Sequence, residues 1–348
     1  MNPYQAVIDS ADFYKEGWIN IMSIPSCPIK VETTAAIKAF AEKYNKSHDI
    51  KIHYPMADSE NAKTYIEALE WVEDPARYPD IVLFCDFKSC FTPNFKRFQA
   101  AGLYTDVLKN KRPHPFYEKF DYQDPKETYS MLGASFPVIV VDKSIDPDLP
   151  VPKSFKDLLD PIYEKKVSIH GHGAFSCDMS VVMNIYQQYG KEAVLTFAKS
   201  IKELRHFSQV VKEAGKGKKD LPPIGIIPEM FKNMIRNKDK VEIIWPEDGA
   251  PLFPLFMTVK KEKVERAKEL IDYLTGPEIG QFWANSYFAA FNGDVDNKPY
   301  DDKPVRFIGW DFIYDQDILA FKEALQGEVI EIISGCPVDQ QKKMKLIC

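Results

Sequence analysis

The sequence predicts an α/β protein organised in two lobes, and three observations support this prediction. First, 348 residues is long for a single hydrophobic core. Second, apolar runs of strand length alternate with segments of helical periodicity from residue 17 to residue 102, a pattern typical of a parallel sheet covered by helices. Third, strands and helices alternate again after residue 129, up to the stretch VEIIWPEDGAPLFPLF (241–256), where two apolar runs flank a short acidic turn.

The first lobe follows a short helix or arm within residues 1–16. Residues 17–25 are a mostly apolar run ended by a proline, which suits a strand buried on both faces of a sheet. Residues 30–48 carry apolar side chains at helical spacing. Gly102 is well placed to end a third helix. The further elements expected here are strands at 49–56 and 78–86 and helices at 61–74 and 93–102.

The second half begins with a long apolar run at 129–144 that contains Gly133 and Pro137. We interpret this run as a strand that changes lobe partway. The remaining elements expected, in chain order, are a short helix after residue 152, a strand at 166–170, helices at 176–190 and 191–208, a strand and a helix within 222–237, strands at 240–246 and 252–259, two helices within 260–286, and a helix near 315–327.

The acidic turn at Glu247 and Asp248 admits two interpretations. It can be a hairpin tip whose carboxylates serve solubility. It can also be the place where the chain passes from one lobe to the other, beside a cleft.

Composition excludes several classes of protein. A net charge of −6 and a pI near 5.7 argue against a nucleic-acid partner. No segment approaches the roughly 18 apolar residues of a membrane span. The N-terminus lacks the basic start and apolar run of a signal peptide, and cleavage at the lipoprotein-like box IPSC (24–27) would remove the first core strand. We therefore expect a cytoplasmic protein if Met1 is the natural start, and a periplasmic or extracellular one if a leader was removed.

The six cysteines match no standard zinc or iron–sulfur spacing. They fit free thiols in a reducing compartment, and a secreted chain can pair some of them. Their connectivity is not readable from sequence. The cysteines stand at positions 27, 85, 90, 177, 336 and 348.

Two segments carry a resemblance to a known family. They are VPKSFKDLLDPIYEKKVSIHG (151–171) and IIWPEDGAPLFPLFMTVKKEKVERAKELIDYLTGPEIGQFWA (243–284). In order and spacing, the chain resembles the periplasmic solute-binding proteins of ABC transporters, in the type II group that includes ferric-iron binders. The resemblance spans roughly residues 17–295.

The resemblance implies a two-lobed type II periplasmic-binding-protein fold, in which two parallel-dominated sheets are joined by two crossover strands. Lobe one would comprise residues 1–136 and 250–348 and hold both termini, and lobe two would be the insertion 137–249. The turn at 247–249 would be the second crossover and the run at 133–137 the first. Two crossings predict hinge closure about a cleft.

Ligands of open α/β sheets bind beyond the carboxyl ends of the strands, so the residues that follow the expected strands are the candidate ligands. A helix N-terminus after residue 86 would offer N–H groups to an anion, and the alternative is a serine cap beside a solvated lysine. The glycines of HGHGAFSC (170–177) would let the backbone approach a ligand. The candidate ligand-binding residues are Ser26, Cys27, Asp86, Lys88, Ser89, Ser135, His170, His172, Ser176, Glu247, Asp248 and Tyr287.

A metal is a further possibility at the histidine-rich loop. His170, His172 and Cys177 form a plausible soft-metal set, and the alternative is a histidine that only hydrogen-bonds in the wall. Family iron binders use two adjacent tyrosines, and this sequence contains no Tyr-Tyr dipeptide. That departure leaves an oxyanion, a carboxylate metabolite, a chelated metal or an organic cation as ligand. No cofactor is required, and a bound metal ion stays open.

The function predicted is a monomeric solute-binding protein that captures a small molecule or ion by hinge closure and delivers it to an ABC permease. A cytosolic ligand sensor on the same fold is the first alternative. An enzyme with Cys177 as nucleophile and a nearby histidine base is the second. The sequence has no GxSxG elbow, P-loop, HExxH motif or GxGxxG after a strand, so we expect no enzymatic activity.

Overall fold

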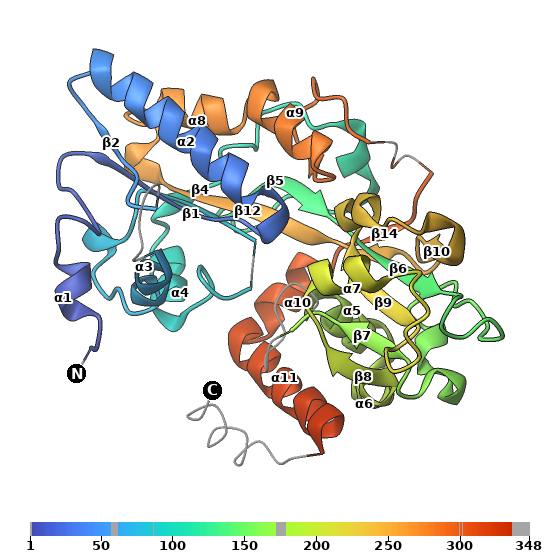
Figure 1. Ribbon diagram of the computed structural model, residues 1–348. Coiled ribbons are helices and arrows are strands. Elements are labelled where there is room, and N and C mark those ends of the chain that lie inside the picture. The colour runs from blue at the N-terminus through green and yellow to red at the C-terminus, as the bar shows by residue number, and fades with distance from the viewer. Residues whose placement is uncertain are drawn as a thin grey trace. The chain divides into compact units, whose positions relative to one another are not determined.

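The chain divides into two compact units, each described here by itself. Unit 1 comprises Met1–Ala134 and Pro254–Lys298, and unit 2 comprises Ser135–Phe253 and Pro299–Cys348. Figure 1 shows the computed structural model. The structure describes residues 2–56, 62–85, 87–171, 179–298, 300 and 302–335.

Unit 1 is built on a seven-stranded sheet in the order β13-β5-β12-β3-β1-β2, with β4 paired to β12. In Figure 1, helices α2, α8 and α9 lie on one side of this sheet, and α3 and α4 lie on the other. Its strands are β1 (Ile19–Ile24), β2 (Ile52–His53), β3 (Ile81–Phe84), β4 (Tyr104–Thr105), β5 (Ser130–Ser135), β12 (Phe253–Lys260) and β13 (Ala289–Ala290). Its α-helices are α1 (Gln5–Ile8), α2 (Cys27–Ser47), α3 (Ala62–Leu69), α4 (Pro93–Ala100), α8 (Lys268–Leu274) and α9 (Pro277–Asn285).

The core of unit 1 follows from its central strands. Every residue of β3 and β12 is buried, as is all of β1 except its last residue. These are the unbroken apolar runs of the sequence, and such runs are stable only when helices cover both faces of the sheet. Thr92 caps α4 by accepting a hydrogen bond from the N–H of Phe95 at 3.2 Å, and Pro93 begins that helix without needing a donor.

Unit 2 is built on a five-stranded sheet in the order β10-β6-β9-β7-β8, and a two-stranded sheet pairs β11 with β14. Its strands are β6 (Pro137–Asp142), β7 (Val167–Ile169), β8 (Ile201–Leu204), β9 (Ile224–Pro228), β10 (Val241–Ile244), β11 (Ala250–Pro251) and β14 (Val305–Arg306). Its α-helices are α5 (Met179–Tyr189), α6 (Lys191–Ser200), α7 (Phe207–Glu213), α10 (Trp310–Asp315) and α11 (Ile318–Ser334).

The α/β class and the two-part organisation predicted from the sequence are confirmed, but the sheets are mixed rather than dominated by parallel pairs. Strand β1 runs parallel to β2 and β3, whereas β12 is antiparallel to β3. In unit 2, β7 is parallel to β8 and β9, whereas β6 is antiparallel to β9 and β10. Of these strands, β6, β10 and β12 are the ones next to a passage between units, and each runs antiparallel to a neighbour in its sheet.

The two expected passages fall where the strands change sheet. The apolar run at 129–144 is two strands, because β5 belongs to the seven-stranded sheet and β6 to the five-stranded one. Likewise β10 and β12 belong to different sheets, so the acidic turn does not connect the two strands of a hairpin. The unit boundaries lie at 134/135 and 253/254, close to the 136/137 and 249/250 expected.

Two segments differ from the sequence-based expectation. Residues 299–348 group with unit 2, because α11 packs against α5, α6 and β8, so the chain passes between units a third time near residue 298. The helix expected at 191–208 ends at Ser200, and β8 follows it. The segment after Ser200 is a strand because it pairs in parallel with β7. Such pairing is a long-range interaction that local periodicity does not encode.

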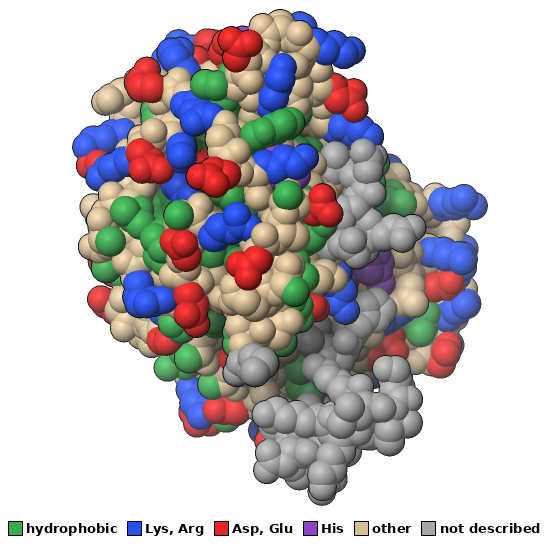
Figure 2. Space-filling model, turned by 90° about the vertical axis from the view of Figure 1, so that its left-hand side faces the viewer, with side chains coloured by type: hydrophobic (Ala, Val, Ile, Leu, Met, Phe, Trp, Pro, Cys, Tyr) green, Lys and Arg blue, Asp and Glu red, His purple; other side chains and the backbone are tan. Residues whose placement is uncertain are grey.

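The described surface shows no continuous basic area on the face drawn in Figure 2, where Lys and Arg side chains are interspersed with Asp and Glu. Within the described residues, none of the helices has the length and apolar character needed to span a membrane.

Candidate functional site

In unit 1, the parallel strands β1, β2 and β3 end at one edge of the sheet. The loops that follow them begin at Pro25, Tyr54 and Cys85. Since ligands of open α/β sheets bind beyond such ends, this edge is the part of unit 1 where a solute would be recognised.

Ser26 lies at the N-cap of α2, a helix of 21 residues. Its side chain makes no capping hydrogen bond, and its Oγ is buried without a hydrogen-bond partner in the described part of the chain. The first N–H groups of a helix also lack intrahelical partners and carry partial positive charge. A serine hydroxyl beside such groups is a donor set suited to an anion.

Tyr54 is a residue at this edge that sequence reasoning missed. It comes directly after β2, and its Oη lies 2.8 Å from the Oγ of Ser23 in β1. Burial raises the pKa of Tyr54, and hydrogen bonds with Ser23 and Thr34 partly oppose that rise. The phenol is therefore neutral at physiological pH. The only sequence feature that could have indicated Tyr54 is its position directly after a strand.

Lys88 and Ser89 follow β3. The ammonium of Lys88 lies 2.7 Å from a carboxylate oxygen of Glu70, and the lysine side chain is 43% exposed. Ser89 is buried, and its carbonyl oxygen accepts a hydrogen bond from the Tyr78 hydroxyl at 3.4 Å. Lys88 is thus paired with a carboxylate of the protein, and its role as a ligand residue stays a prediction.

In unit 2, the parallel strands β7, β8 and β9 also end at one edge. His170 follows β7, and its ring stacks on Phe207 with a centroid distance of 4.2 Å. His206 follows β8, and its ring lies 5.2 Å from that of His170. His206 also caps α7, since its Nδ1 accepts a hydrogen bond from the N–H of Ser208 at 3.2 Å. The edge therefore carries two neighbouring imidazoles.

Glu229 follows β9 at the same edge, and sequence reasoning missed it too. Its side chain is only 2% exposed, and its Oε1 lies 2.6 Å from the Lys232 ammonium and 3.2 Å from that of Lys303. Lys303 also stands 4.4 Å from the ring centroid of Trp245. The Oε2 of Glu229 is buried without a hydrogen-bond partner among the described residues. The sequence feature that could have indicated Glu229 is a carboxylate directly after an apolar strand.

Asp248 and Glu247 lie in unit 2 on the turn after β10. The Asp248 carboxylate accepts hydrogen bonds from the backbone N–H groups of Phe155 and Lys156, both at 3.1 Å. Its carbonyl oxygen accepts from the Arg306 guanidinium at 2.8 Å. Glu247 is exposed, and its N–H donates to the carbonyl of Lys153 at 2.8 Å. The Asp248 carboxylate is thus engaged by the protein itself.

Two further candidates lie elsewhere. Ser135 is a buried residue at the end of β5. Tyr287 adopts a positive φ of 64°, and the ammonium of Lys298 stands 5.4 Å from its ring centroid. A tyrosine in the left-handed region is strained, and such strain often marks functional positions. These observations do not test a ligand role for Ser135 or Tyr287, so both roles remain predictions.

Several candidate residues lie outside what the structure describes. For Cys27 the structure describes only the backbone, at the first residue of α2. Of the proposed metal set, only His170 is described. Within the described residues, no group of three or more His, Cys, Asp or Glu side chains is arranged to hold a metal ion. The candidates that lie outside the described residues are Asp86, His172, Ser176 and Cys177.

An α/β fold with polar groups at the ends of its parallel strands is an arrangement in which open sheets bind ligands. The family of bacterial extracellular solute-binding proteins matches residues 76–316, which is more than half of the chain. The chain belongs to this family, as its resemblance to solute-binding proteins predicted. Capture of a small solute is accordingly its function. A search among curated proteins gave no match.

Solved structures of other proteins share this fold. The apo ferric ion-binding protein A of Pasteurella haemolytica has a TM-score of 0.63 at 18% identity, over 91% of this chain and 98% of that one. FutA of Trichodesmium, in complex with iron and citrate, has a TM-score of 0.59 at 15% identity, over 91% and 98%. AfuA of Actinobacillus pleuropneumoniae, with fructose 6-phosphate bound, has a TM-score of 0.60 at 13% identity, over 92% and 99%. At these identities the likeness concerns the fold alone.

Proposed function

We propose that the solute is a small organic anion that carries a phosphate or carboxylate group. The observation that carries this proposal is the Ser26 hydroxyl, buried without a partner among the described residues at the N-terminus of a 21-residue helix. A buried hydroxyl that forms no hydrogen bond costs free energy, and an anion placed there would satisfy it together with the first N–H groups of the helix.

Unit 2, taken by itself, also carries groups that fit an anion. Lys232 and Lys303 bring two positive charges to the single carboxylate of Glu229. His170 and His206 bring two imidazoles to the same edge of the sheet. The solutes named for two structural neighbours, fructose 6-phosphate and citrate with iron, both include phosphate or carboxylate groups. The proposal needs a few charge-assisted hydrogen bonds, each stronger than a bond between neutral groups.

A metal ion is the second candidate, because two neighbours are iron-binding proteins. The absence of a Tyr-Tyr dipeptide argues against direct ferric binding through paired phenolates. Ferric citrate would reconcile both candidates, since the organic anion would carry the metal. A resident metal held by His170, His172 and Cys177 stays a separate proposal, which metal analysis of the purified protein tests.

The location of the protein and its transport partner are proposals as well. Membership of an extracellular solute-binding family favours a protein that acts outside the cytoplasm and delivers its solute to an ABC permease. The remaining alternatives, a cytosolic sensor on the same fold and a thiol-dependent enzyme, both predict that the protein works without a permease. Co-purification with an ABC permease would distinguish delivery from sensing.

The first experiment is a thermal-shift screen of protein that has been stripped of solute by mild unfolding and refolding. The panel holds fructose 6-phosphate, phenyl phosphate, citrate, ferric citrate, inorganic phosphate, zinc and spermidine. A ligand present at about a hundred times its Kd should add about 2.7 kcal/mol to the free energy of unfolding, a shift of several degrees. We expect sugar phosphates or carboxylates to give this shift.

A matched pair of variants assigns the site. Ser26→Ala should weaken the anion about tenfold or more, because a hydrogen bond to a charged group contributes about 1.5–3 kcal/mol. Ser47→Ala, at the other end of α2, should leave the affinity unchanged. A shift produced only by zinc or spermidine would overturn the anion proposal. Small-angle scattering with the active solute would test hinge closure, which predicts a smaller radius of gyration.

A further inference from the structure

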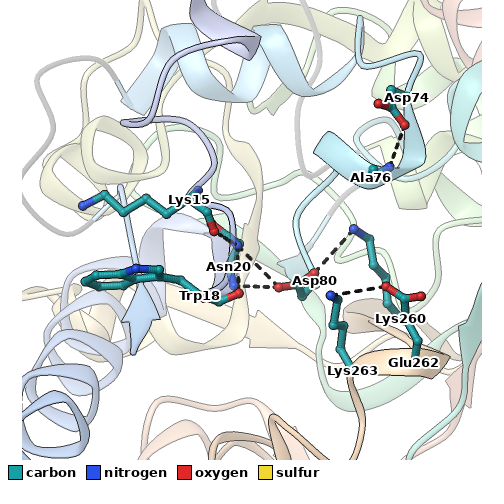
Figure 3. A network of polar contacts seen from close by, with 9 residues as sticks. All are labelled: Lys15, Trp18, Asn20, Asp74, Ala76, Asp80, Lys260, Glu262 and Lys263. Atoms are coloured by element: carbon teal, nitrogen blue, oxygen red, sulfur yellow. Dashed lines mark hydrogen bonds and ion pairs between the residues drawn. The ribbon is translucent and has the colours of Figure 1, made fainter. Parts of the chain in front are cut away.

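Unit 1 contains a cavity of about 600 Å³ at the edge of its sheet opposite to the strand ends discussed above. Asp80 immediately precedes β3, and Lys260 is the last residue of β12, which is antiparallel to β3. Both residues therefore lie at the amino-terminal edge of the parallel strands. Figure 3 shows them within a network of polar contacts that includes Asn20. A volume of this size is within the range of small-molecule sites.

A buried charged group in the wall of this cavity is the ammonium of Lys260, whose side chain is 6% exposed. Its Nζ lies 3.4 Å from the Oδ1 of Asp80, which is longer than a normal hydrogen bond. The other oxygen of Asp80 accepts the N–H of Asn20 at 2.9 Å. Among the described residues, Asp80 is the only carboxylate that forms an ion pair with this ammonium.

An ammonium has three N–H donors, so a single distant carboxylate leaves Lys260 with donors to spare. Burial lowers the pKa of Lys260, and Asp80 opposes that change. A buried charge with incomplete partners is costly, and a second acceptor in the cavity would reduce that cost. Lys260 is therefore a buried cation in the cavity wall whose ammonium can donate hydrogen bonds to an anionic group.

Tyr14 forms the aromatic part of the same wall. It is 9% exposed, with the Lys260 ammonium 5.5 Å and the Arg77 guanidinium 5.3 Å from its ring centroid. Burial raises the pKa of Tyr14 to about 12, so its hydroxyl is a neutral donor. Arg77 is held by the carbonyl of Ile8, which accepts from its guanidinium at 2.5 Å. The arginine is thereby fixed beside the ring.

The rest of the lining combines apolar surface with excess positive charge. Four basic side chains line the cavity against two acidic ones, Glu16 and Glu262. Glu262 is already paired with Lys263 at 3.3 Å. This local excess stands against a chain whose net charge is −6. The apolar surface comes from Pro75, Ala76 and Leu103.

We propose that this cavity binds a second small organic anion, with its carboxylate or phosphate group at Lys260 and its apolar body against Tyr14, Ala76 and Leu103. The site is separate from the solute site proposed at the opposite edge of the sheet. It gives the protein a place where a metabolite can bind without competing with the captured solute.

The experiment uses the full chain and two aromatic probes, benzoate and phenyl phosphate, with neutral benzamide as the control ligand. Binding is measured by isothermal titration calorimetry and located by crystal soaking. We expect both anions to bind and benzamide to bind at least tenfold more weakly. The double variant Lys260→Met/Asp80→Asn removes the buried charges together and leaves an acceptor for Asn20, and it should lose at least tenfold in anion affinity.

A second pair of variants guards against a folding defect in the double variant. Ala76 is exposed at the rim, so Ala76→Trp should fold and fill the cavity. Ala39→Trp, at an exposed position of α2 outside the cavity, is its matched control. We expect probe binding to be lost in Ala76→Trp and kept in Ala39→Trp. Equal binding of benzamide, no binding of either anion at 10 mM (roughly −3 kcal/mol), or unchanged binding in Ala76→Trp would each overturn the proposal.

Discussion

At the scale of single residues, a carboxylate can bind a ligand or accept hydrogen bonds from the backbone. The groups that surround it in the fold determine which of these roles it has. Asp248 sits on an acidic turn beside Glu247, and nothing in the local sequence separates the two. In the structure, the Asp248 carboxylate accepts two N–H groups from residues more than ninety positions earlier in the chain. Glu247 is exposed on the same turn. The two acids therefore differ in what their removal should cost.

Replacement of Asp248 by alanine should lower the free energy of unfolding by about 1–3 kcal/mol, because two backbone donors lose their acceptor. Glu247→Ala should change stability by less than about 0.5 kcal/mol, as is usual at an exposed position. Urea denaturation of both variants measures the difference. Equal stability of the two variants would show that the hydrogen bonds of Asp248 make no net contribution to the free energy of unfolding. Solute affinity measured on the same variants would test the ligand role predicted for both.

At the scale of elements, α11 is the clearest case of a segment whose place depends on packing. It lies in unit 2 against α6, with Leu325 and Val329 buried. An exposed ion pair, Lys191 to Glu328 at 2.9 Å, accompanies this packing. Surface ion pairs contribute little, so the buried apolar side chains hold the helix in place. The resemblance to the family had placed this segment in the other lobe.

Leu325→Ala should therefore destabilise unit 2 by about 2–4 kcal/mol, through lost burial and the cavity left behind. Glu323→Ala, an exposed position of the same helix, is the matched control and should change stability by less than about 0.5 kcal/mol. Calorimetry of the two variants reports the change. If Leu325→Ala unfolded at the wild-type temperature, α11 would not be packed on α6 as described.

At the scale of the whole molecule, unit 1 concentrates buried tyrosines whose phenols stay neutral. Burial raises the pKa of Tyr14 to about 12, and it also raises the pKa values of Tyr78, Tyr104 and Tyr117. In the unfolded chain a tyrosine ionises near pH 10. A group whose pKa is raised on folding contributes stability that is present below the unfolded pKa and lost as pH rises through the folded one.

The midpoint of urea unfolding should consequently fall from pH 10 to pH 12. Lys260 acts in the opposite sense, since its lowered pKa favours the folded state as pH rises, but the tyrosines outnumber it. Tyr14→Phe removes one ionisable phenol without breaking a hydrogen bond among described residues, so its midpoint should fall less steeply with pH. Absorbance at 295 nm follows ionisation directly. Ionisation of all 17 tyrosines near pH 10 in folded protein would contradict the prediction.

Local signals in the sequence were enough for much of the fold. The strands β1, β3 and β12 are unbroken apolar runs, and α2 and α4 begin next to proline and a serine or threonine. Strands buried on both faces and helix caps depend on residues close together in the chain. The order of these elements also sufficed to recognise the family. It directed attention to Ser26, which the structure leaves without a partner in its described part.

Other features were decided only by the tertiary structure. The antiparallel direction of β12 against β3, the strand β8 and the passage of the chain near residue 298 all depend on which distant segments pair. Glu229 meets Lys303 across 74 positions, and Lys260 meets Asp80 across a sheet. Residue type and periodicity carry no information about such contacts. The sequence by itself therefore determined the class, the family and most elements, whereas long-range packing determined strand direction, the second cavity and the partners of every buried charge discussed here.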